Sequence, residues 1–233
     1  VKAVAQAADE LDQPVMMAIT ENAISYAGFD YLVNIVKTAK EICGTDVYLH
    51  LDHGRSFKVI EKAIEADFDS IMYDGSSLPE NENIAKTREV KEMIGDKNIN
   101  LEAELGHVGR QVDDEGLLSN PQDASNFVKE TTVDTLAVSI GTVHGIVKDQ
   151  KIDYDRLADI RELVDVPLVI HGCSGLSSSQ VSKLVSHGAN KFNIDSEIRK
   201  AFMDGLRENI KESDPRRALG ASIVEMREVV KDK

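Results

Sequence analysis

Three of the six histidines in this chain lie where predicted strands end, and each is followed by glycine. They are His53, His144 and His171, in the segments LDHG, GTVHG and VIHGCSG. The carboxyl ends of parallel strands meet on one face of a barrel, so these side chains are expected to converge there. Three imidazoles with an open position for substrate are a common ligand set of catalytic zinc. We therefore predict a zinc site, although each histidine alone would equally suit a strand-end residue bonded to a backbone carbonyl.

A carboxylate directly precedes one of these histidines. Asp52 stands before His53, and a carboxylate beside a metal-bound imidazole can move protons while the metal holds substrate oxygens. Asp52 could instead be an outer partner that orients a ligand. Asp74 and Glu104 also end predicted strands. Either could serve an alternative metal position or simply hydrogen-bond a histidine.

The other three histidines have ordinary explanations. His50 lies inside a predicted strand and is expected to be packed or to face inward. His107 falls in a polar loop. His187 precedes a glycine near the end of a predicted helix, where a cation suits the helix dipole.

Two small, polar segments near the end of the chain predict a phosphate site. HGCSGLSSSQ follows one late strand, and NIDSE ends the last one. Gly172, Ser174 and Gly175 offer free backbone N–H groups and lead into a helix near Ser177–Gln180. Loops after the last two strands of a barrel, together with a helix N-terminus, commonly bind phosphate.

These residues must be positioned by a repeating strand–helix pattern. Short apolar runs alternate with stretches of helical spacing, which predicts parallel strands joined by helices. The segments EADFDSIMYDG, TTVDTLAVSIG and SHGANKFNID share one form, a helix end followed by a buried strand. The expected strands are Pro14–Thr20, Asp46–Asp52, Ser70–Asp74, Ile99–Leu105, Thr135–Ile140, Pro167–His171 and Lys191–Ile194. The expected helices include Tyr31–Cys43, Ser56–Ala66, Asn81–Ile94, Ala124–Thr131, Tyr154–Val164 and Ser178–His187.

The expected fold class is α/β, a (β/α)8 TIM barrel forming a single domain over residues 1–233. The helical pattern of Val1–Ala8 precedes the first expected strand, which fits a barrel whose first strand is missing from this sequence. A doubly wound parallel sheet is the competing architecture, because functional residues at strand carboxyl ends suit both folds.

Composition narrows the possible partners. The net charge of −14 over 233 residues argues against nucleic-acid binding, because phosphate-backbone recognition requires a basic face. It does not exclude a small phosphorylated substrate, which a local cluster of amides and cations can hold. Two cysteines form no disulfide framework and fit a reducing cytoplasm. Without an apolar run of about 20 residues, no membrane span is expected.

The segments LHLDHG, EAELGHVG, SIGTVHG, VIHGCSGL and NIDSEIR occur in this order. From Pro14 to Arg199 the chain resembles the class II fructose-bisphosphate and tagatose-bisphosphate aldolases. The resemblance implies cleavage of a ketose 1,6-bisphosphate to dihydroxyacetone phosphate and glyceraldehyde 3-phosphate, through an enediolate stabilised by Zn2+. It also implies a homodimer or homotetramer and a monovalent cation, Na+ or K+, near the phosphate.

The resemblance assigns roles to individual residues. His53, His144 and His171 match the zinc ligands, and Asp52 matches the acid/base at the C4 oxygen. Positions near the alternative metal site are matched by Asp74 and Glu104. The phosphate and substrate contacts are matched by Gly145, Gly172, Cys173, Ser174, Asn193, Ile194, Asp195 and Ser196, with Arg199 at a position that reaches the distal phosphate in some members.

The chain departs from the family pattern in the segment Gly109–Asp114. The family usually has a second glycine followed by an acidic pair, whereas here Gly109 is followed by RQV and only then by Asp113 and Asp114. This loop supplies a carboxylate for enolisation in several members. That role would pass to one of the two aspartates or be weakened. Cys173 stands where glycine or alanine is frequent, and its small side chain is expected to pack.

Lys191 could suggest Schiff-base chemistry, but the histidines already supply an electrophile, so a structural or surface lysine is expected.

Three other functions remain open from the sequence. A non-catalytic aldolase-like subunit, an aldolase for a related ketose phosphate, and a metal-dependent epimerase or isomerase are the alternatives.

Overall fold

The computed structural model describes residues 1–109 and 118–233 of the chain. Seven parallel strands form one sheet, and their order in the sheet is the order in the sequence. All seven expected strands are present, and no strand end differs from its expected position by more than two residues. They are β1 (Val15–Thr20), β2 (Val47–Gly54), β3 (Ser70–Tyr73), β4 (Asn100–Leu105), β5 (Thr135–Val138), β6 (Leu168–Ile170) and β7 (Ala189–Phe192).

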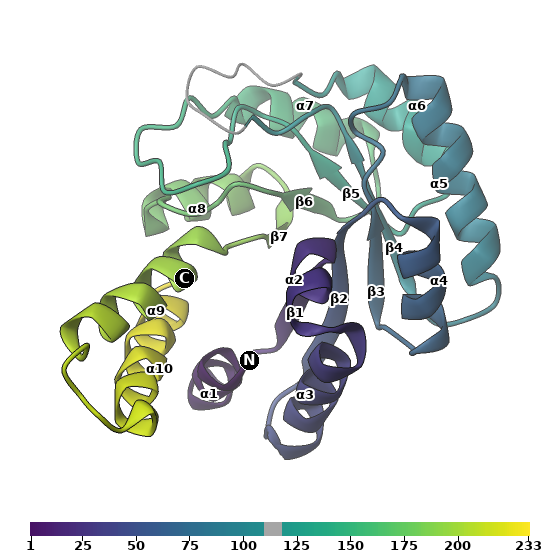
Figure 1. Ribbon diagram of the computed structural model, residues 1–233. Helices are drawn as coiled ribbons and strands as arrows, with labels where there is room; N and C mark the ends of the chain where they lie inside the picture. The colour runs from purple at the N-terminus through teal and green to yellow at the C-terminus, as the bar shows by residue number, and fades with distance from the viewer. Residues whose placement is uncertain (110–117) are drawn as a thin grey trace.

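The sheet is curled, and helices cover its outer side (Figure 1). A doubly wound sheet is excluded, because its strand order reverses at a switch point, whereas every neighbouring pair here is consecutive. Among the described residues, β1 and β7 pair with one neighbour each and form the two edges. The arrangement is that of a barrel of eight strands from which one strand is absent.

The six expected helices are all found, and the described residues form four further helices. The expected ones are α3 (Phe29–Ile42), α4 (Phe57–Glu65), α5 (Glu80–Ile94), α6 (Pro121–Thr131), α7 (Tyr154–Leu163) and α8 (Ser178–Ser186). The chain opens with α1 (Lys2–Leu11), as its first residues predicted, and adds α2 (Glu21–Ala27), α9 (Ser196–Glu208) and α10 (Pro215–Lys231). Helix α10 packs against α9 and α1 (Figure 1). No helix in the described part of the chain could span a membrane.

The three similar segments of the sequence share one structural device. In each, an Asx side chain at or just before the start of the strand accepts a hydrogen bond from a leucine N–H of the preceding strand. Asp69 accepts from Leu49 at 2.7 Å, and Asp134 accepts from Leu101 at 2.8 Å. Asn190 does the same for Leu168 at 3.0 Å. These bonds satisfy backbone donors at the amino end of the sheet, and so fix where each strand starts.

Candidate active site

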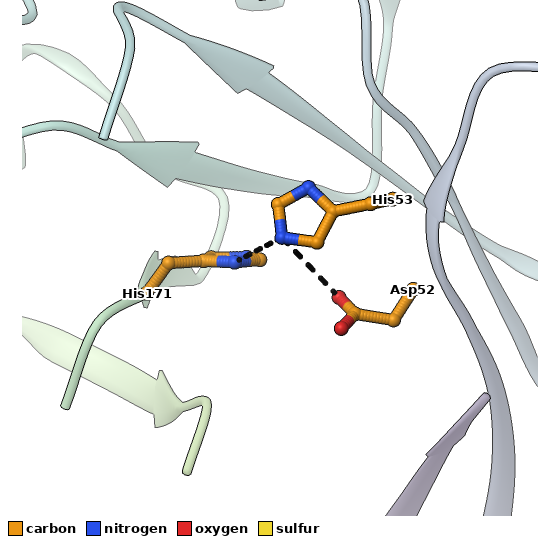
Figure 2. A group of neighbouring side chains, drawn as sticks. All are labelled: Asp52, His53 and His171. Atoms are coloured by element: carbon orange, nitrogen blue, oxygen red, sulfur yellow. Dashed lines mark hydrogen bonds and ion pairs between the residues drawn. The ribbon is translucent and has the colours of Figure 1, made fainter. Parts of the chain in front are cut away.

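The end of β2 places two neighbouring side chains on the same side of the sheet. In a regular strand, successive side chains point to opposite faces. Here His53 has a φ of 49°, and the pairing of β2 with β3 shifts between Leu51 and Gly54. Asp52 and His53 therefore both point toward His171 (Figure 2). A histidine in the left-handed region is strained, and such strain is often concentrated at functional sites.

Glycines after the other two histidines turn the chain. Gly145 has a φ of 110° and Gly172 a φ of 70°, a region that favours glycine. At the first pair, His53 itself makes the turn. Gly54 is instead needed for close approach, since a Cβ there would lie 2.8 Å from the carbonyl oxygen of Met72.

The three histidines meet at the carboxyl end of the sheet. His53 Nε2 faces His171 Nδ1 at 3.2 Å, and the two ring centroids are 4.8 Å apart. The ring of His144 lies 5.6 Å from that of His53 and 6.3 Å from that of His171. Two nitrogens bound to one tetrahedral zinc ion at about 2.0–2.1 Å stand roughly 3.3 Å apart. The separation between His53 and His171 therefore suits two ligands of one ion.

Each of the two facing rings has a carboxylate on its far nitrogen. Asp74 Oδ2 is 2.9 Å from His53 Nδ1, and Glu102 Oε1 is 3.3 Å from His171 Nε2. In a neutral imidazole, a carboxylate at that position accepts the ring N–H, and the opposite nitrogen carries no proton. The two free nitrogens are then the pair that faces the centre.

Asp74 is held rigidly from several sides. Its Oδ2 also accepts from Arg55 Nη2 at 2.6 Å, and its Oδ1 accepts from Ser76 Oγ at 2.6 Å. Burial alone would raise the pKa of this carboxyl, but hydrogen bonds from His53, Ser76 and Arg55 hold it well below its usual range. Asp74 is therefore an ionised anchor for His53. Arg55 was not predicted, because nothing in its sequence position marks a partner 19 residues away.

Glu102 is part of a second buried hydrogen-bond network, which lies at Nε2 of His171, whereas His53 lies at Nδ1 of that ring. Its Oε2 accepts from Lys191 Nζ at 2.7 Å, and the same ammonium lies 3.2 Å from His50 Nε2. Burial would raise the pKa of Glu102, but the charge of Lys191 and the hydrogen bond from His171 hold it well below its usual range. Lys191 is thus a structural lysine, as expected, and His50 is buried, as expected. Burial, together with the charge of Lys191, lowers the pKa of His50 to about 4.

The charge balance of the site favours a bound cation. Burial would lower the pKa of His53, but its hydrogen bond to Asp74 and the charges of Asp52, Glu104 and Asp74 raise it to about 9. Burial raises the pKa of Glu104, whose Oε2 lies 3.8 Å from His53 Nδ1 and is buried with no hydrogen-bond partner among residues 1–109 and 118–233. An unpaired buried carboxylate oxygen is costly unless a cation or a proton compensates it.

Two clusters in the described chain have the donors and spacing of a metal site. Asp52, His53 and His171 form one, and His53, Asp74 and Glu104 form the other, each with ligand atoms within 4.8 Å of one another. Nitrogen with carboxylate donors suits zinc. His144 borders the first cluster but does not belong to it. The structure therefore brings the three predicted histidines together, with His144 further out than the other two.

The side-chain amide of Asn193 holds Asp52 beside the three histidines. Its Oδ1 accepts from Asn193 Nδ2 at 3.2 Å and lies 4.0 Å from His53 Nε2. The Asn193 amide is also within 3.4 Å of the His171 ring. Asn193 follows β7, so it links the last strand to the end of β2. The sequence placed it among phosphate-binding residues, whereas the structure shows it against the carboxylate and the ring.

Of the predicted phosphate residues, Ser174 lies against Asp195 and Ser196 at the N-terminus of α9. Ser174 Oγ accepts from Asp195 N at 3.3 Å and from Ser196 N at 3.1 Å. A Cβ placed on Gly145 would meet nothing within 4 Å, so its backbone borders open space. A helix N-terminus suits an anion.

Three other predicted residues contribute differently. Cys173 is buried and its Sγ donates to the carbonyl oxygen of Ile170, so its side chain packs, as expected. Ile194 packs against the core. Arg199 is exposed and forms an ion pair with Asp195 at 2.7 Å.

In the segment Gly109–Asp114, only Gly109 is among the described residues; its carbonyl accepts from the N–H of His144 at 2.9 Å.

Comparison with known proteins identifies the class. The family model described as "Fructose-bisphosphate aldolase class-II" matches residues 1–233. The fructose-bisphosphate aldolase of Geobacillus stearothermophilus is 37% identical over 231 residues, which is 94% of this chain and 80% of that protein. The chain therefore belongs to the class II fructose-bisphosphate aldolase family, whose members are lyases.

Solved structures agree with this assignment. The crystal structure of the YdjI aldolase from Escherichia coli K12 matches with a TM-score of 0.89 at 29% identity, over 99% of this chain and 83% of that one. The structure of fructose-bisphosphate aldolase from Campylobacter jejuni matches with a TM-score of 0.84, over 99% of this chain and 84% of that one. At 24% identity, the second likeness concerns the fold alone. The family predicted from the sequence motifs is confirmed.

Proposed function

We propose that this chain is a zinc-dependent aldolase that cleaves a ketose 1,6-bisphosphate, of the fructose or tagatose configuration, into dihydroxyacetone phosphate and glyceraldehyde 3-phosphate. The observation that carries this proposal is the pair of facing nitrogens of His53 and His171, 3.2 Å apart, each backed by a carboxylate. His144 completes the proposed ligand set. Asp74 and Glu104 are proposed to border an alternative metal position.

Zinc at this position would polarise the substrate ketone and stabilise negative charge on its oxygens. The chain itself supplies the proton transfer. We assign Asp52 as the base that takes the proton of the C4 hydroxyl during cleavage and returns it in the reverse reaction. Asn193 donates to Asp52 and fixes one carboxylate oxygen, so the other remains available. The carboxylate that would assist enolisation is predicted at Asp113 or Asp114.

The phosphate of the dihydroxyacetone end is proposed to bind beside the N-terminus of α9. Gly145, Gly172 and Ser174 would form one wall, and Asp195 and Ser196 the other. The wider substrate contacts are proposed to include the backbones of Cys173 and Ile194, the amide of Asn193, and Arg199 at the distal phosphate.

Family membership supports several further proposals. We propose a single domain over residues 1–233, a homodimer or homotetramer, a monovalent cation near the phosphate, and a cytoplasmic location. The single domain is supported by one apolar core that runs from Met17 on β1 to Ala189 on β7. Light scattering of the purified protein tests the oligomer.

The substrate is tested with a panel of ketose phosphates. Zinc-loaded protein is assayed for triose phosphate release from fructose 1,6-bisphosphate, tagatose 1,6-bisphosphate and related ketose phosphates. We expect release from at least one of the two bisphosphates. Stoichiometric zinc binding with no turnover on any of them would instead indicate a non-catalytic subunit. Conversion of the sugar without release of fragments would indicate an epimerase or isomerase.

Replacement of Glu102 tests the network behind the metal position. Glu102→Gln removes the charge that receives the His171 N–H and the Lys191 ammonium, so the ring loses its fixed orientation. Loss of such an outer partner typically costs about 10- to 100-fold in metal affinity. Competition with a chromophoric zinc chelator measures this change. Glu92→Gln, on the exposed side of α5, is the matched control and should bind zinc like the unchanged protein.

A further inference from the structure

Gln150 lies in the loop between β5 and α7, and its side-chain hydrogen bonds within the described part of the chain all go to backbone groups. Its Oε1 accepts from the N–H of Val143 at 3.0 Å. Its Nε2 donates to the carbonyl oxygens of Val147 at 3.1 Å, Gly172 at 3.0 Å and Ser174 at 3.4 Å. These partners belong to two separate loops, the one after β5 and the one after β6.

The identity of the partners fixes the orientation of the amide. A backbone N–H lies on the oxygen side and carbonyl oxygens lie on the nitrogen side, so a flipped amide would lose every bond. Glutamate could keep the bond to Val143 N, but its second oxygen would face carbonyl oxygens. An apolar side chain of the same length could fill the space but could bond to neither loop.

The two loops meet backbone to backbone at this point. A Cβ on Gly172 would lie 2.6 Å from the carbonyl oxygen of Val143. A Cβ on Gly175 would lie 2.8 Å from the backbone nitrogen of Val147. Both contact points are glycines, which have no side chain of their own to hold the loops together. The Gln150 amide is placed to supply that connection.

The two loops that Gln150 connects contain residues proposed to bind the metal and the phosphate. The loop after β5 contains His144 and Gly145, and the loop after β6 contains His171 and Ser174. We propose that Gln150 is a positioning residue that holds these two loops in one arrangement, and thereby sets the metal-side histidines and the phosphate-side groups relative to one another. This inference rests on the proposed aldolase function. The partners of Gln150 lie outside the sheet, since β5 and β6 end before both loops.

Hydrogen exchange tests the loop connection without reference to catalysis. Gln150→Met keeps the length of the side chain and removes its hydrogen bonds. We expect faster amide exchange in residues 141–149 and 171–176, with α6 and the strands unchanged. Gln122→Met is the matched control, because Gln122 bonds to Asn126 on the exposed face of α6. Exchange in both loops equal to that of the unchanged protein would overturn the proposal.

Kinetics test the functional consequence. For Gln150→Met we expect KM for the cleaved bisphosphate to rise roughly tenfold, the size expected when a net hydrogen bond or two is lost from a site. The value of kcat should fall by less. Gln150→Glu should raise KM further, because it sets a carboxylate against carbonyl oxygens. Equal losses of activity that follow thermal stability, with KM unchanged in both variants, would contradict a positioning role.

The two proposals fail in different ways. If the unchanged protein releases no triose phosphate, the proposed function is wrong, and the exchange data alone decide whether Gln150 connects the loops. If the unchanged protein is active and Gln150→Met keeps its KM and its exchange pattern, the aldolase assignment stands and the inference about Gln150 is wrong.

Discussion

The Asp52→Asn variant is expected to bind zinc stoichiometrically and to lose roughly 10²- to 10⁴-fold in kcat, the usual contribution of a positioned acid or base. The side chain keeps its size, so the contact with Asn193 can be replaced by an amide contact. The zinc position changes little, because His53 and His171 are untouched. What is lost is the carboxylate that accepts the C4 hydroxyl proton. Steady-state cleavage and zinc content, measured on the same preparation, check this outcome.

A surface aspartate provides the control for Asp52. Asp155 is exposed in the first turn of α7, and Asp155→Asn should keep the activity of the unchanged protein. If Asp52→Asn keeps its kcat within a few-fold, proton transfer at C4 belongs to another group. If it instead loses zinc, Asp52 is a ligand, as its position in a cluster with His53 and His171 would allow.

The His171→Ala variant is expected to have the other large effect, the loss of tight zinc binding. This histidine is buried between the His53 ring and Glu102. Its removal takes away one proposed ligand and leaves Glu102 with only its Lys191 partner. The loss in zinc affinity should exceed the roughly 10- to 100-fold expected for an outer partner. Chelator competition measures the affinity, and His187→Ala, at the end of α8, is the control.

The same measurement on His144→Ala decides the third ligand. The sequence predicts His144, whereas the structure places its ring 5.6 Å from that of His53 and 6.3 Å from that of His171, further than the 4.8 Å between those two rings. A loss of affinity like that of His171→Ala supports the three-histidine set. Retained affinity would mean that Asp52 or Glu104 supplies the third donor.

The sequence was most informative about the strands and helices and about the site residues that lie at strand ends. Strands and helices followed from apolar spacing, and the histidines at strand ends followed from the parallel topology. The resemblance between EADFDS, TTVDTL and HGANKF proved to have a physical cause, the Asx side chain that binds the preceding strand. The segments look alike because each needs an aspartate or asparagine at the position that makes this bond.

The rest depended on contacts between distant parts of the chain. Glu102 is 69 residues from His171 and 89 from Lys191. One signal was available, because Glu102 and Glu104 are two positions apart on one strand and therefore share a face. The left-handed turn at His53 had no signal, since it arises from the shifted pairing of β2 and β3. The role of Gln150 was equally hidden, because its partners are backbone groups of any residue type.

Cleavage by metal-free protein is the most direct test of a zinc-dependent aldolase. Zinc is removed with a chelator, its absence is verified by atomic absorption, and triose phosphate release from fructose and tagatose 1,6-bisphosphates is followed before and after zinc is restored. The account predicts no release without zinc and recovery when zinc is added. Release at the original rate from verified metal-free protein would contradict it.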